Sequence, residues 1–191
     1  MIFLPILSAG LLLLAFPNAW LPLGLWPAAW IFFVPLAFCL DRQSWRTRLV
    51  YGGLFSLLFY GLLVSWFIPY HRLGYLVFVL ALSVQGIGFA VLFPCAFSGS
   101  WPRVLYWPAL WVVSEGARVV LMKGFAWGLG MSQSFNLPVL QIARVWGGAG
   151  IAFLVVLVNA GLYEALVHPR ARRRVLPILA LLMAGIWAAG S

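Results

Sequence analysis

Seven long apolar stretches, separated by short polar or proline-containing segments, form the dominant pattern along the chain. Most approach the ~20 residues that a membrane-spanning helix needs. The stretches cover residues 2–16, 23–40, 49–68, 75–97, 104–122, 138–167 and 175–189. The pattern therefore predicts an all-α fold, a polytopic membrane helical bundle of about seven transmembrane helices.

Two of these stretches depart from a simple crossing helix. The second contains Pro27 and Pro35, which membrane helices tolerate when neighbouring groups satisfy the freed carbonyls. The sixth is longer than one crossing needs, and its first part carries Gln141 and Arg144 before a glycine pair at 147–148. We expect that first part to lie in the membrane interface.

The composition supports a membrane protein. Hydrophobic residues make up 65% of the chain and charged residues only 8%, against about 25% charged in a typical soluble domain. So little charge excludes a soluble globular enzyme, and so much apolar sequence excludes a disordered chain. Seven helices with short loops use nearly the whole chain, so we expect residues 1–191 to form a single transmembrane domain.

The net charge of +9 comes from basic residues that lie mostly between the apolar stretches. This placement is typical of membrane orientation and of contact with anionic lipid, and we find no nucleic-acid-binding pattern. The positive-inside rule favours an N-terminus inside and a C-terminus outside, with eight arginines on the inner side and four basic residues on the outer side. The inner group is Arg42, Arg46, Arg48, Arg103, Arg170, Arg172, Arg173 and Arg174, and the outer group is Arg72, Arg118, Lys123 and Arg144.

Aromatic, small and amide residues add expectations about packing. Seven of the eleven tryptophans fall near predicted helix ends, as in an aromatic belt: Trp20, Trp26, Trp66, Trp101, Trp107, Trp127 and Trp146. Gly86 with Ala90, and Gly148 with Ala152, have the spacing that lets membrane helices approach closely. Asn159 lies deep in the sixth stretch, and we expect it to hydrogen-bond to another helix.

Neither the cysteines nor the histidines form a recognisable reactive site. Cys39 and Cys95 lie in apolar stretches without a neighbouring His or Lys, so structural packing is favoured over a nucleophilic role. His71 and His168 fall on opposite membrane sides and cannot form one metal site. We therefore expect no metal or other cofactor, and we assign no catalytic residue.

Residues 108–133 are the richest in candidate chemistry. Glu115 and Arg118 are three residues apart and share a helix face. Charges within a membrane span are costly, so they pair or line a cavity. Two interpretations remain open: a structural ion pair, or an outer-surface site in which Arg118 and Lys123 hold a lipid phosphate while Glu115 orients Arg118.

Aromatic residues follow this pair at the depth of the lipid headgroups. The candidate lipid-binding residues are Glu115, Arg118, Lys123, Phe125, Trp127 and Gln133.

Several short motifs, taken in order, resemble the N-terminal membrane region of apolipoprotein N-acyltransferase, the bacterial enzyme that adds the third acyl chain to lipoproteins. The best match is Glu-Gly-Ala-Arg at 115–118 followed by Gly-Phe-Ala-Trp at 124–127. The family usually shows Gly-Phe-Pro-Trp there, so Ala126 departs from the pattern. The other matching positions are 16–17, 32–36, 52–53, Trp66, Gly130, 132–133, Gln141, 147–150, Phe153 and Asn159.

The resemblance implies a membrane scaffold without its chemistry. Family members carry a nitrilase-like domain with a Glu-Lys-Cys triad after the seventh span, and this chain ends at Ser191, about where that domain is expected to begin. Cys39 and Cys95 do not match the family nucleophile. The acyl donor that the resemblance implies is a phospholipid, in the bacterial cytoplasmic (inner) membrane.

Three interpretations of function remain open. The chain is a scaffold and lipid-access part of a split N-acyltransferase, working with a separate nitrilase-like subunit and a lipoprotein substrate. Alternatively, it is a stand-alone lipid-binding or transport protein, or an inactive truncated fragment.

Overall fold

A computed structural model describes residues 2–18, 20–93, 100–124 and 127–190, and the regular elements of these segments are all helices. The predicted all-α fold class is thereby confirmed. The elements are α1 (Phe3–Ala15), η1 (Trp26–Trp30), α2 (Phe33–Leu40), α3 (Trp45–Leu63), η2 (Ser65–Phe67), α4 (Arg72–Leu92), α5 (Ser100–Leu121), η3 (Leu129–Gln133), α6 (Leu137–Leu140), α7 (Ala143–Val167) and α8 (Pro169–Gly190), where η marks a 3₁₀-helix.

Three helical segments in the described part of the chain are long and apolar enough to cross a membrane. They are Arg72–Leu92, Arg103–Leu121 and Ala143–Val167, whereas the apolar helix Phe3–Ala15 and the apolar segment Trp26–Leu40, which comprises η1 and α2, are shorter. These apolar helices support a membrane protein, while the count of seven spans stays a prediction.

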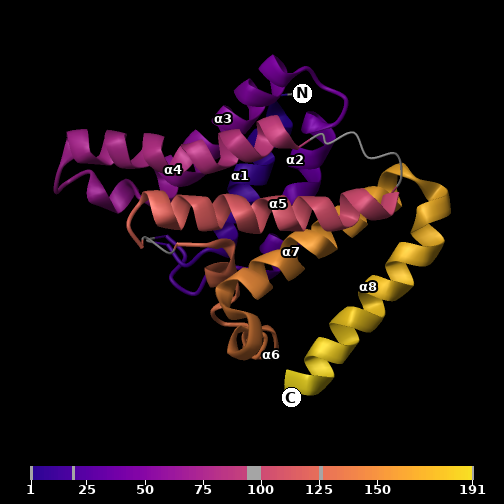
Figure 1. Ribbon diagram of the computed structural model, residues 1–191. Coiled ribbons are helices and arrows are strands. Elements are labelled where there is room, and N and C mark those ends of the chain that lie inside the picture. The colour runs from indigo at the N-terminus through magenta and orange to yellow at the C-terminus, as the bar shows by residue number, and fades with distance from the viewer. Residues whose placement is uncertain (1, 19, 94–99, 125–126, 191) are drawn as a thin grey trace.

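The central helices pack side by side along their lengths. Figure 1 shows α4 and α5 alongside each other, α7 crossing beneath α5, and α8 slanting away from α7. A close approach joins α3 and α4, where a Cβ added to Gly52 would overlap Ala90, and one added to Gly86 would overlap Ser56. The small residues Gly86 and Ala90 thus allow the close helix contact that their spacing predicts.

The second apolar stretch is not one continuous helix. It divides into η1 and α2, and Asn159 of α7 satisfies backbone groups on both sides of the break. The Asn159 amide nitrogen donates to the Ala29 carbonyl at 2.9 Å, and its oxygen accepts from the Phe33 N–H at 2.9 Å. The expected hydrogen bond from Asn159 to another helix is thereby confirmed.

The sixth stretch breaks where its glycine pair predicts. Gly147 has φ +61° and ψ −167°, a conformation that residues with a side chain rarely adopt, and it separates the first turn of α7 from the long remainder. Gln141 and Arg144 are both exposed ahead of this break.

The arginine-rich segment 169–174, between the sixth and seventh apolar stretches, predicts a loop, and this prediction is wrong. Its residues form the first turns of α8, which begins at Pro169. Proline suits the first position of a helix because its φ is already helical and no intrahelical partner is needed there for an N–H.

An aromatic core lies between α2, α4 and α5. The Phe33 ring packs edge-to-face against Phe89 at 5.4 Å and Trp107 at 5.7 Å between ring centroids. Trp107 is only 2% exposed, so it belongs to this core and not to an aromatic belt. Trp20, Trp66 and Trp146 are exposed, as a belt requires.

Candidate functional site

Two polar networks lie along α5, one near each end. The first surrounds Glu115 and Arg118 and is called the Glu115 network below. The second surrounds Glu164 of α7, which meets Arg103 of α5, and is called the Glu164 network. Fifteen helical residues separate Arg103 from Arg118, which is roughly 22 Å along the axis.

Fixed donors hold the Glu115 carboxylate. The Trp111 indole N–H, one turn earlier, donates to Oε1 at 3.0 Å, and the Leu129 backbone N–H donates to the same oxygen at 2.6 Å. Gly128 permits this approach, since a Cβ at that position would lie 2.9 Å from Oε2. The carboxylate therefore fastens the segment after α5 to the helix itself.

Arg118 is buried within the same network, with only 3% of its surface exposed. Its Nε donates to Gln85 Oε1 at 2.6 Å, and a terminal nitrogen donates to the Trp127 carbonyl at 2.9 Å. Gln85 Oε1 also accepts from the Tyr60 hydroxyl at 3.1 Å. Gln85, on α4, thus connects α3 and α5 through one amide oxygen.

A groove between α4 and α5 runs past this network. It encloses about 240 Å³, and its lining is apolar except for Gln85, Ser114 and Arg118. Val84 and Val113 line it and are exposed, so the groove opens onto the surface of the bundle. Arg118 is therefore both part of the buried network and part of the wall of an open apolar groove.

The remaining predicted lipid-binding residues occupy different places. Lys123 is exposed in the turn that ends α5, with φ +52°. Phe125 lies outside the described residues. The Trp127 ring packs edge-to-face on Trp66, with 6.3 Å between ring centroids.

Gln133 is fully buried in a separate set of hydrogen bonds. Its oxygen accepts from Trp30 Nε1 at 3.1 Å and from Asn136 Nδ2 at 3.0 Å. Its nitrogen donates to the Trp26 carbonyl at 3.1 Å and to Ser132 Oγ at 3.2 Å. Gln133 thus fixes η3 against η1, whereas Glu115, Arg118 and Trp127 are brought together in the Glu115 network, of which Arg118 also lines the groove.

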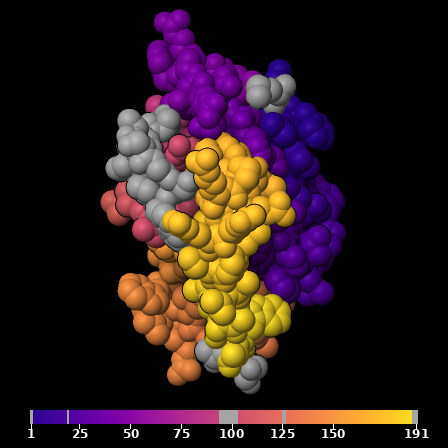
Figure 2. Space-filling view, turned by 90° about the vertical axis from the view of Figure 1, so that its right-hand side faces the viewer, coloured from indigo at the N-terminus to yellow at the C-terminus, as the bar shows by residue number. Residues whose placement is uncertain are grey.

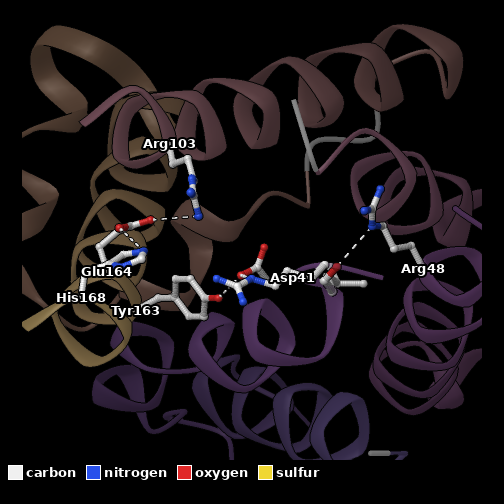
Figure 3. A network of polar contacts seen from close by, with 8 residues as sticks. Asp41, Arg48, Arg103, Tyr163, Glu164 and His168 are labelled. Atoms are coloured by element: carbon white, nitrogen blue, oxygen red, sulfur yellow. Dashed lines mark hydrogen bonds and ion pairs between the residues drawn. The ribbon is translucent and has the colours of Figure 1, made fainter. Parts of the chain in front are cut away.

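The Glu164 network was not predicted from the sequence. Glu164 has no exposed surface. Its Oε1 lies 3.7 Å from an Arg103 terminal nitrogen and its Oε2 lies 3.5 Å from His168 Nε2 (Figure 3). The available signal was a single acidic residue in an apolar stretch, four positions before a histidine.

A second part of this network ties the ends of α2 and α7 together. The Tyr163 hydroxyl donates to Asp41 Oδ2 at 2.8 Å, and the Arg48 Nε donates to the Leu40 carbonyl at 3.2 Å (Figure 3). Cys39 is buried beside these residues, where its thiol donates to the Leu36 carbonyl at 3.2 Å. Cys95 lies outside the described residues.

Comparison with known proteins gives one consistent result. Residues 8–161 match the family model described as the apolipoprotein N-acyltransferase N-terminal domain. Three curated relatives carry the name apolipoprotein N-acyltransferase. The protein from Geobacter metallireducens is 32% identical over 83% of this chain, that from Methylococcus capsulatus is 32% identical over 97%, and that from Coxiella burnetii is 27% identical over 94%.

These relatives are much longer than the present chain. The matched region covers 32% of the Geobacter protein, 38% of the Methylococcus protein and 39% of the Coxiella protein. The chain therefore spans 32–39% of the length of these three relatives.

Proposed function

This chain belongs to the apolipoprotein N-acyltransferase N-terminal domain family, and from that premise we propose that it is the lipid-access scaffold of an N-acyltransferase-type system. In this proposal it lies in the bacterial cytoplasmic (inner) membrane and serves lipoprotein N-acylation. It admits a phospholipid acyl donor and positions it, and a nitrilase-like partner supplies the Glu-Lys-Cys chemistry.

The α4–α5 groove is the observation that carries the proposal. A groove with apolar walls suits an acyl chain, because the chain buries its methylene groups there. Arg118 lines the same groove, and Lys123 is exposed at the end of α5 five residues later. A cation in the groove wall and a second cation just beyond the end of the lining helix favour a phosphate group there, since guanidinium and ammonium groups make charge-assisted hydrogen bonds to phosphate.

The buried donors around Glu115 support a positioning role for that residue. Trp111 and the Leu129 backbone fix its carboxylate. Gln85 and Trp127 fix Arg118 in turn. A guanidinium held in one place loses little conformational entropy when a ligand binds, which strengthens binding.

An exchange of charges tests the proposal. Wild type, Glu115→Arg, Arg118→Glu and the double exchange are purified in mild detergent, and retained phospholipid is measured together with thermal stability. We expect the double exchange to lose most of the retained lipid, because it places a carboxylate beside the phosphate. Arg144→Glu, an exposed basic residue expected on the same membrane side, is the matched control and is expected to retain lipid.

The buried exchange carries a risk of misfolding, so Lys123→Glu provides a second measurement. Lys123 is exposed, and its substitution is expected to leave stability unchanged while reducing lipid retention severalfold. A stable exchange variant that retains lipid at the wild-type level, together with an unchanged Lys123→Glu variant, would leave only a structural role for the pair.

The catalytic part of the proposal has its own test. The purified chain, given phospholipid and a lipoprotein with a free amine, is expected to transfer no acyl group, because a thioester mechanism needs an activated thiolate and an oxyanion stabiliser. In a system reconstituted with a nitrilase-like partner, Cys39→Ala is expected to keep transfer within about tenfold of wild type. Turnover by the chain alone would contradict the division of labour.

A further inference from the structure

Two hollows meet at the first turns of α8, the helix that runs down the face shown in Figure 2. The first encloses about 620 Å³ and is lined by side chains of α1, α2, α7 and α8, all apolar except Arg172. The second encloses about 500 Å³ and is lined by residues of α8, including Arg172 and Arg173. Both are lined by Arg172 and Leu176, so an apolar groove and a basic hollow adjoin at these two side chains.

The charges at this junction are unbalanced. Arg170, Arg172, Arg173 and Arg174 all lie in the first turns of α8 and are exposed, and the first turn of α8 has no acidic residue. Among the described residues, no carboxylate lies within 4.0 Å of these four guanidinium groups. The helix N-terminus adds a partial positive charge of its own, so four cations there repel the helix dipole unless an anion neutralises them.

We propose that this pair of hollows binds one anionic phospholipid, with an acyl chain in the apolar groove and the phosphate on Arg172 and Arg173. The shape of the site matches that chemistry, because a lipid joins one anionic group to long apolar chains at a fixed point. Leu7 of α1 and Leu166 of α7 line the groove and are exposed, so an acyl chain can enter from the surrounding bilayer. Figure 2 shows α8 (yellow) beside the indigo and violet surface of the first helices, which places both walls on one face.

This site is separate from the groove of the proposed function. Arg172 lies at the end of the bundle that holds Glu164 and His168, whereas Arg118 lies about 22 Å farther along α5 than Arg103, the α5 residue that meets Glu164. Under the predicted topology the site faces the cytoplasmic leaflet, where anionic lipids attract basic segments at about 1 kcal/mol per Lys or Arg. A lipid bound here would contact α8, α1 and α2 together and so stabilise their packing.

Lipid adducts counted by native mass spectrometry test the inference. The full chain is released from detergent micelles that contain either dioleoyl phosphatidylglycerol or dioleoyl phosphatidylcholine. We expect a phosphatidylglycerol adduct to persist and a phosphatidylcholine adduct to be at least fivefold weaker. Arg172→Gln is expected to reduce the phosphatidylglycerol adduct about fivefold, in line with the loss of one cation near a lipid surface, while Arg46→Gln, an exposed arginine of α3, is expected to leave it unchanged.

A groove-filling pair separates a built site from general basic attraction. Leu7→Trp places a large ring in the apolar groove, while Ile6→Trp adds the same ring at a neighbouring exposed position that does not line it. We expect Leu7→Trp alone to abolish the adduct, with both variants melting near the wild-type temperature.

Three outcomes would overturn the inference. Equal loss from both tryptophan variants, or from neither, would mean that the arginines attract lipid without a groove. Displacement of the lipid by inorganic phosphate at equal concentration would mean an anion site only. A dimer that Leu7→Trp dissociates would mean that a second copy of the chain covers this face.

Discussion

The Glu115 and Glu164 networks solve the same physical problem in different ways. Each buries a carboxylate in a membrane helix, where an unsatisfied charge is very costly. Glu115 receives two hydrogen bonds of 2.6 and 3.0 Å from an indole and a backbone N–H. Glu164 faces Arg103 and His168 at 3.7 and 3.5 Å, and the side chains of these partners are 27% and 36% exposed.

The two networks differ in which groups must move before the contacts of the carboxylate break. Around Glu115 the donors are the buried Trp111 side chain and the backbone of the buried Leu129, so the geometry is fixed and any lost partner leaves a buried group unsatisfied. Around Glu164 the partners are partly exposed side chains that water can solvate when they turn away. We therefore expect the Glu115 network to be the more costly to break and the more sensitive to shape.

Loss of the buried guanidinium should give the largest effect. Arg118→Met removes the donors to Gln85 and Trp127 and leaves the Glu115 carboxylate without a compensating charge. We expect the free energy of unfolding to fall by about 3–5 kcal/mol, measured by SDS titration in mixed micelles. The exposed Arg144→Met should change it by less than about 0.5 kcal/mol, and equal effects of the two substitutions would contradict the buried network.

Neutralising each carboxylate compares the two networks directly. Glu115→Gln introduces an amide NH₂ group, which is itself a donor, beside the N–H donors of the network. We expect the substitution to lower the free energy of unfolding by about 2–4 kcal/mol. Glu164→Gln loses the long ion pair to Arg103 and the contact with His168, but it also removes the desolvation cost of a buried charge, so we expect the free energy of unfolding to fall by about 1–2 kcal/mol. The same titration measures both, and a larger loss for Glu164→Gln would reverse the comparison.

A single methyl group probes the shape of the Glu115 network. Gly128→Ala brings a Cβ to within 2.9 Å of the carboxylate, and we expect a loss of about 1–2 kcal/mol from the crowding. Gly116→Ala is the matched control, because nothing lies within 4 Å of its Cβ position on α5. That control should be neutral or stabilising, since alanine favours helix over glycine.

Two tyrosines give the smallest expected effects. Tyr60→Phe removes a bond to Gln85, whose oxygen keeps the Arg118 donor, and we expect a loss of about 1 kcal/mol. Tyr163→Phe removes a bond to the partly exposed Asp41, which water can replace, so we expect about half of that or less. Thermal melts of the two variants in the same detergent check the order, and a greater loss for Tyr163→Phe would contradict it.

The sequence predicts the helical class because a long apolar stretch indicates a helix whichever other helices it packs against. It also places Glu115 and Arg118 on one face, since three-residue spacing is a local property of a helix. It could not name Gln85 as the residue between α3 and α5, because helix pairing is not encoded in local spacing. The sequence does allow Glu164 to be predicted as a site of buried polar contacts, since an acidic residue inside an apolar stretch needs a partner.

The helix boundaries also fall into two groups, those that follow from local sequence and those that depend on distant residues. The Gly147 break follows from a local preference of glycine, whereas the break between η1 and α2 depends on the Asn159 amide far along the chain. The start of α8 was missed because a run of arginines suggested a loop, although Pro169 is a local helix-start signal.

Asn159 has a consequence for biogenesis. It satisfies Phe33, a residue made 126 positions earlier. At translation rates of ~5–20 residues per second, roughly 6–25 s pass between the synthesis of the two partners. During that interval the η1–α2 break carries backbone groups that hydrocarbon cannot satisfy, so we expect this segment to wait in the insertion machinery or at the bilayer surface. One asparagine would then set the moment at which the second stretch enters the membrane.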